Sequence, residues 1–177
     1  MGAHLEPYEN CELPLTPALD GYETVPEGQI AERMAAVIQL EAPIERDRLC
    51  NLVRASFGIA RSGRLVQEKN LFVLGTVPHT TTSWNDRTFI WKEGQDPACY
   101  DACRENGGRD VDQIAPEELL AAIELSLPAG AAQGQKLDRS ELVSRVAATL
   151  GYSRVRSRLR VVLGEAVDLA ASRGLPV

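Results

Sequence analysis

The sequence predicts a mainly α-helical protein with a small β-hairpin, organised as two related helical units. Three observations support this fold class: an internal repeat, apolar residues at helical spacing, and one segment rich in β-branched and aromatic residues. The chain has 177 residues, of which 44% are hydrophobic, so it can form one ordinary core or two small ones.

An internal repeat relates residues 43–61 to residues 136–154 without a gap. Gly151 follows Gly58 by 151 − 58 = 93 positions, and the same offset joins many pairs of like residues. Among these pairs are Ile44 and Leu137, Arg46 and Arg139, Leu49 and Leu142, Val53 and Val146, and Arg61 and Arg154. The repeat predicts two helices in each copy, with the glycine ending the first and the arginine beginning the second.

The first copy is expected to belong to a helical unit over residues 28–92, after an extended lead-in over residues 1–27 that contains four prolines. Apolar residues at i, i+4, i+7 and i+8 predict a first helix from about Gln29. Pro43 interrupts this helix and favours a short extended piece before the next one.

A second helix is expected over about Arg46–Phe57, and a third from near Ser62. The third helix departs from a regular pattern, because Lys69 falls inside its expected apolar arc. That arc consists of Leu65, Val66, Phe72 and Val73.

A hairpin is predicted over residues 80–91. Thr80–Trp84 and Thr88–Trp91 are rich in β-branched and aromatic residues, and they flank the turn-forming triplet at 85–87. We expect the two tryptophans to pack the hairpin against the helices, with base stacking as the alternative. Helix, short strand, helix, helix and hairpin is the element order of a winged helix, a helix-turn-helix variant with a β wing.

A polar, glycine-containing stretch over residues 93–112 predicts a linker. Residues 113–177 predict a second helix-turn-helix-like unit, with a loop over residues 128–134 after its first helix. Asp138 is expected to cap the next helix, and a last helix over about Arg154–Ser172 has the most regular apolar period in the chain. The prediction is therefore two tandem winged-helix-like units, of which the second lacks a wing.

Arginines at the start of the third helix of each unit are the candidate nucleic-acid-binding residues, because this helix of a winged helix usually enters the major groove. They are Arg154, Arg156, Arg158 and Arg160 in the second unit, and Arg61 and Arg64 in the first. Arg87, at the expected hairpin tip, could contact a phosphate or could be a turn residue in water. The other arginines could equally be solvated edges that pair with carboxylates.

The net charge of −6, with a pI near 5.0, argues against a protein whose whole surface attracts nucleic acid, but it allows a local basic patch. No apolar run reaches the roughly 20 residues that span a bilayer. The N-terminus lacks the basic and apolar segments of a signal peptide. We therefore expect a cytoplasmic protein, or a fragment of one, with no membrane partner.

No phosphate-binding loop, dinucleotide fingerprint, zinc-protease motif or nucleophile elbow occurs in the sequence, so we expect no catalytic residues, no enzymatic activity and no cofactor. Cys99 and Cys103 form a C-x3-C pair and are weak candidates for metal ligands. A zinc site needs about four ligands, and only one close pair is present. Two reduced thiols are the alternative interpretation.

Several of these motifs together resemble the family DUF3320, a domain of unknown function. The residues that carry the resemblance are Glu41–Leu65, Phe89–Trp91, Ile114–Ile123 and Leu142–Leu159, within a span of about residues 30–172. Domains of this family lie toward the C-terminal end of very large bacterial helicase-like proteins, which often carry a restriction-endonuclease-like domain. The resemblance implies an accessory module of an ATP-driven, nucleic-acid-processing enzyme, with no motor or nuclease residues in this chain.

Two functions remain open from the sequence. The chain could be a DNA-binding module that helps a helicase or nuclease engage its substrate. Alternatively, it could be a module that docks onto helicase or nuclease domains of the same or a partner protein, without binding nucleic acid. Arginines of the last helix that face carboxylates would favour docking.

Overall fold

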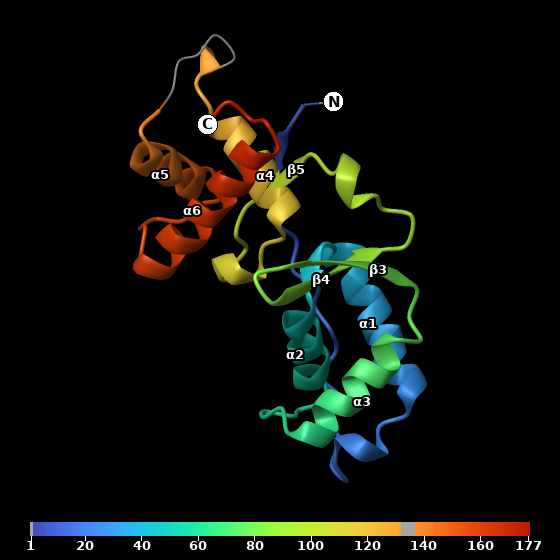
Figure 1. Cartoon of the computed structure of the whole chain (residues 1–177). Coiled ribbons are helices and arrows are strands. Elements are labelled where there is room, and N and C mark those ends of the chain that lie inside the picture. The colour runs from blue at the N-terminus through green and yellow to red at the C-terminus, as the bar shows by residue number, and fades with distance from the viewer. Residues whose placement is uncertain (1, 132–136) are drawn as a thin grey trace. The chain divides into compact units, whose positions relative to one another are not determined.

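The computed structural model describes residues 2–131 and 137–177. These residues are mainly helical with two small sheets, and the mainly helical class that the sequence predicts is confirmed (Figure 1). The chain divides into two compact units. The N-terminal unit is Glu9–Gln95, and the C-terminal unit joins the residues up to Tyr8 with Asp96–Val177. Among the described residues, no helix is both long and apolar enough to cross a membrane.

The N-terminal unit combines one 3-10 turn, three helices and three antiparallel strands in the order β2-β4-β3. Ile44 and Thr81 pair with Ile90 from opposite sides, so β4 is the central strand. The hairpin lies where the sequence predicts it, and Asn85 and Asp86 at its turn have positive φ, as a two-residue hairpin requires. The elements are η1 (Tyr22–Thr24), α1 (Glu27–Glu41), β2 (Ile44–Glu45), α2 (Arg46–Ser56), α3 (Arg64–Leu74), β3 (His79–Trp84) and β4 (Arg87–Lys92).

The core of this unit consists largely of the apolar residues that the helical spacing identifies. Trp91 is fully buried, and its indole N–H donates to Thr82 Oγ1 at 2.9 Å across the hairpin. This tryptophan therefore packs, as expected, and does not present a face for base stacking. The main buried side chains are Ile30, Met34, Val37, Ile38, Leu49, Val53, Phe57, Val73 and Ile90.

Helix α3 differs from the prediction in the face that it buries. Leu65 and Phe72 are exposed, whereas Asn70 is buried. The reason is Lys69, whose ammonium group donates to the backbone carbonyls of Tyr22, Glu23 and Val25 at 3.2, 2.8 and 2.6 Å. The Tyr22 hydroxyl also donates to Asn70 Oδ1 at 2.5 Å. These polar contacts fix the end of the expected lead-in against α3. Of the predicted arc, Val73 is buried and Val66 packs against the core, whereas Leu65 and Phe72 are exposed.

The described part of the C-terminal unit contains three α-helices and a two-stranded parallel sheet that pairs the N-terminal segment with the middle of the chain. Leu5 pairs with Cys103 in this sheet. The loop expected over residues 128–134 and the first residue of the second repeat copy, Lys136, lie partly or wholly outside the described residues. The elements are β1 (His4–Glu6), η2 (Pro97–Cys99), β5 (Ala102–Arg104), η3 (Val111–Gln113), α4 (Pro116–Ser126), α5 (Arg139–Thr149) and α6 (Ser157–Ser172).

The stretch over residues 93–112, which the sequence predicts as a linker, instead contributes buried groups to the C-terminal unit. Arg104 Nε donates to Glu118 Oε1 at 2.5 Å, and Arg109 donates to Glu118 Oε2 at 2.7 Å. All three side chains are almost completely buried, and both guanidinium groups lie over the ring of Tyr8. Two charged residues of this stretch therefore belong to an internal ion-pair network.

The internal repeat is present in the backbone. Helices α2 and α5 begin and end 93 positions apart, and α3 and α6 begin 93 positions apart. Gly58 and Gly151 both follow the second helix with a left-handed φ, of 74° and 79°. The repeat also includes an earlier part that the sequence comparison missed. There η1 and η3, and likewise α1 and α4, begin 89 positions apart.

Replacing Gly58 by alanine should lower the free energy of unfolding by about 1–2 kcal/mol, because an L-residue is strained at this left-handed φ. Urea denaturation measures the change. Gly28→Ala is the matched control, since Gly28 lies in the first turn of α1 and a Cβ there meets nothing within 4 Å. The control should keep or gain stability, so equal losses in both variants would contradict the assignment.

Glu118→Gln should destabilise the protein by about 3 kcal/mol or more, because it leaves two buried guanidinium charges without a counter-charge. Glu117→Gln is the control. Burial raises the pKa of the Glu117 carboxyl, so the ionised form costs stability as pH rises above the ordinary carboxyl range. In urea denaturation at neutral pH, the free energy of unfolding of Glu117→Gln should equal or exceed that of the wild type. A larger loss of this free energy in Glu117→Gln than in Glu118→Gln would refute the network.

Candidate nucleic-acid interface

The four arginines of the second copy surround the N-terminal end of α6 rather than lie along it. The sequence predicts a helix from about Arg154, but α6 begins at Ser157. Arg154 and Arg156 therefore precede the helix, and Arg158 and Arg160 lie in its first turn. This corrects the expectation that the helix begins at about Arg154.

The later start has a local cause in the turn that follows α5. Gly151 ends that helix in a left-handed conformation, and the Tyr152 N–H then donates to the Ala147 carbonyl at 2.9 Å. The Tyr152 hydroxyl donates to the Arg109 carbonyl at 2.9 Å, and burial raises the pKa of this hydroxyl to about 12. Tyr152 is thus fixed, the chain bends at Ser153 and Arg154, and Arg156 is extended with a ψ of 167° just before α6 begins.

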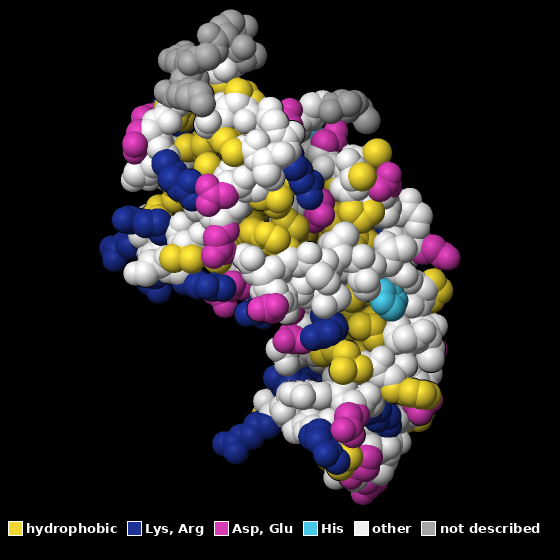
Figure 2. Space-filling model, viewed as in Figure 1, with side chains coloured by type: hydrophobic (Ala, Val, Ile, Leu, Met, Phe, Trp, Pro, Cys, Tyr) yellow, Lys and Arg dark blue, Asp and Glu magenta, His cyan; other side chains and the backbone are white. Residues whose placement is uncertain are grey.

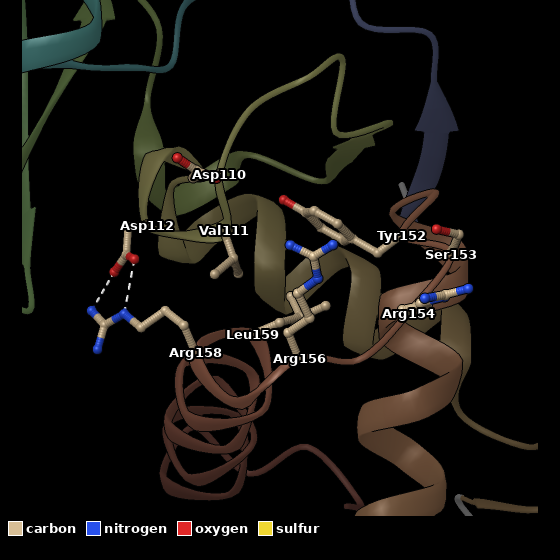
Figure 3. Close-up of a pocket in the computed structure, with 9 residues that line it drawn as sticks. All are labelled: Asp110, Val111, Asp112, Tyr152, Ser153, Arg154, Arg156, Arg158 and Leu159. Carbon is tan, nitrogen blue, oxygen red and sulfur yellow. Dashed lines mark hydrogen bonds and ion pairs between the residues drawn. The ribbon is translucent and has the colours of Figure 1, made fainter.

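A pocket of about 490 Å³ opens between this arginine segment and η3 (Figure 3). One wall is acidic and the other is basic, with Val111 and Leu159 between them. In Figure 3 the Arg158 side chain extends toward Asp112, while Arg154 extends in the opposite direction. The residues that line the pocket are Asp110, Val111, Asp112, Tyr152, Ser153, Arg154, Arg156, Arg158 and Leu159.

Arg158 forms a two-pronged ion pair with Asp112. Its Nε donates to Oδ2 at 2.8 Å, and a terminal N–H donates to Oδ1. The hydrogen bond with Asp112 raises the pKa of Arg158. This arginine therefore does face a carboxylate, as the docking hypothesis expects.

Arg154, Arg156 and Arg160 are exposed and form no ion pair with any residue that the structure describes. Figure 2 shows basic side chains gathered over the part of the C-terminal unit that holds α5 and α6. The first turn of α6 contains no acidic residue. Cations at this end oppose the helix dipole, so a bound anion would relieve an unfavourable arrangement.

The N-terminal unit has a smaller version of the same arrangement. Arg61 is exposed just before α3, and Arg64 begins that helix and lies 3.3 Å from Glu68. Of the six α-helices in the described chain, α3 and α6 alone have no acidic residue in the first turn. Arg87 lies at the start of β4, where it approaches buried Glu45 at 3.8 Å.

The two cysteines considered as metal ligands lie in different environments. Cys99 is exposed, whereas Cys103 is buried and burial raises its thiol pKa to about 12. Cys103 is therefore a poor source of the thiolate that binds metal. Within the described residues, no group of three or more His, Cys, Asp or Glu side chains could hold a metal ion.

Comparison with known proteins identifies one family. Residues 20–68 match the model of DUF3320, described as a protein of unknown function. No curated protein and no solved structure matches the chain. The matched segment runs from before η1 into the first turns of α3, within the N-terminal unit. Over this segment, the match supports the resemblance to the DUF3320 family.

Proposed function

We propose that this chain is a non-catalytic accessory module that contacts the sugar–phosphate backbone of DNA. The observation that carries the proposal is the group of arginines around the N-terminal end of α6, three of which have no ion pair within the described residues. Arginine side chains and the free N–H groups of a helix N-terminus both bind phosphate in protein–DNA complexes.

The arrangement favours backbone contact over base reading. A recognition helix lies in the major groove with its N-terminal residues against base edges, so the rest of its exposed face also approaches the DNA. In α6, the exposed positions beyond the first turns include Glu165 and Asp168, which phosphate would repel. The helix would therefore meet DNA with its end, and binding would depend on salt more than on sequence.

The fold and the family fit an accessory role. We infer that the two copies are winged-helix-like units, since the first has the order helix, strand, helix, helix, hairpin and the second repeats its helices. In this interpretation α3 and α6 are the equivalent DNA-facing helices. On the resemblance to DUF3320, we propose that this module belongs to a larger helicase- or nuclease-like protein.

Arg156→Ala and Arg160→Ala should each weaken binding to a short DNA duplex. Each lost phosphate contact should reduce the slope of log K against log salt by about 0.9. Fluorescence anisotropy at several salt concentrations measures both quantities. Arg145→Ala is the matched control, because it removes the same charge from an arginine of α5 that pairs with Glu141. Equal effects in all three variants, or no binding at low salt, would rule out the proposal.

Docking onto another protein domain is the second candidate function, and the exposed side of α3 favours it. Leu65, Leu71 and Phe72 are 69%, 48% and 63% exposed. At the repeat offset of 93, Leu65 corresponds to Arg158 and Phe72 to Glu165. The second copy thus has charged residues where α3 has Leu65 and Phe72. The apolar character of these two residues is therefore not needed for the core.

The double variant Leu65→Gln/Phe72→Gln tests the docking function. We expect it to fold as stably as the wild type and to lose any protein that co-purifies stoichiometrically with the tagged chain from its native host. Arg156→Ala should retain that protein, because its side chain lies on the other unit. Retention by the double variant would argue against docking through α3.

A further inference from the structure

Asp112 binds the guanidinium group of Arg158, which the proposed DNA-contacting site would use. Arg158 Nε lies 2.8 Å from Asp112 Oδ2, and a terminal N–H of the same group bonds Oδ1. This fork is the geometry in which arginine holds two oxygens of a phosphate. Of the four arginines around the start of α6, Arg158 is the one that pairs with a carboxylate of the described chain.

The carboxylate is the fixed member of this pair. Asp112 lies in η3, next to buried Val111, and the Asp110 N–H donates to Gln113 Oε1 at 3.1 Å in a reciprocal cap. The Asp112 side chain is 17% exposed, whereas that of Arg158 is 59% exposed. In Figure 3 the Arg158 side chain reaches from α6 to Asp112. Because its stem is long and solvated, the guanidinium can leave Asp112 without any movement of η3.

We propose that Asp112 is an internal phosphate mimic that masks Arg158 until a DNA backbone displaces it. This inference rests on the proposed function. Neighbouring phosphates held by Arg154, Arg156 and Arg160 would bring a further phosphate close to Arg158 at high local concentration. A single free anion gains no such advantage, so the mask favours a polyanionic backbone over isolated anions.

A second ion pair on the same helix provides a matched control. Arg139 bonds Asp168 at 2.5 and 2.8 Å, again through two prongs, with both side chains more than half exposed. Asp168 lies in the C-terminal half of α6, away from the arginine group. Asp168→Asn therefore removes the same charge and the same kind of pair without unmasking an arginine at the site.

Anisotropy titration of the full chain with a labelled duplex of about 20 base pairs tests the mask. Asp112→Asn should bind roughly threefold to tenfold more tightly than the wild type, with a salt slope steeper by about 0.9. Asp168→Asn should change affinity by less than about twofold. In the double variant Asp112→Asn/Arg158→Ala the gain should disappear, because it depends on the freed guanidinium.

The possible failures can be told apart. Equal gains in Asp112→Asn and Asp168→Asn, or a gain that survives removal of Arg158, would overturn the mask while leaving the proposed function intact. If Arg156→Ala and Arg160→Ala bind duplex as tightly as the wild type, the proposed function is overturned. If no variant binds duplex at low salt, Asp112→Asn included, both fall.

Discussion

The C-terminal unit depends on the buried ion pairs that the Glu118 carboxylate forms with Arg104 and Arg109. Removing a carboxylate and two guanidinium groups from water is costly, and the cost is recovered only with good geometry. Each oxygen of Glu118 accepts a guanidinium N–H, and the Tyr8 ring lies under both arginines. The carbonyl of Arg109 then accepts the Tyr152 hydroxyl. One buried anion thus positions η3 and the arginine segment, which are the two walls of the candidate site.

The two copies of the repeat share their backbone elements but differ in the side-chain contacts between their helices. In the second copy, Arg139 crosses α6 and donates to the Gly164 carbonyl at 2.8 Å. A Cβ at Gly164 would lie 3.3 Å from its guanidinium, so a glycine leaves room for this crossing. The equivalent residue in the first copy is Leu71, and Arg46 there approaches only its neighbour Asp47, at 3.5 Å. In the second copy, a side chain of α5 therefore bonds α6 directly. In the first copy, a groove lies beside exposed Leu71 instead.

Local patterns in the sequence predict the elements and leave the long-range contacts unseen. The helical period identifies Ile30, Met34 and Val146 as core residues, and the β-branched runs locate the hairpin, because both signals lie within a few neighbouring residues. Lys69 breaks the pattern of α3 because its partners, the carbonyls at 22–25, are more than 40 positions away.

The same limit applies to the candidate site. The arginines of the candidate site can be found in the sequence as a closely spaced group, and the repeat predicts that they lie near the start of a helix. Their relation to that helix depends on Tyr152, whose partner Arg109 lies in a stretch that composition marks as a linker. Asp112 is missed for the same reason, since nothing nearby in the sequence indicates that it meets Arg158.

The pairing of β1 with β5 governs the order in which the molecule can form. His4 and Ala102 are partners in this sheet, so almost a hundred residues separate them along the chain. During synthesis, β1 leaves the ribosome first and has no partner until β5 follows. The intervening Glu9–Gln95 has its own core and can fold in that interval. The sheet of the C-terminal unit can therefore close only after β5 has been made, and its strand pairing adds contacts between residues far apart in the sequence.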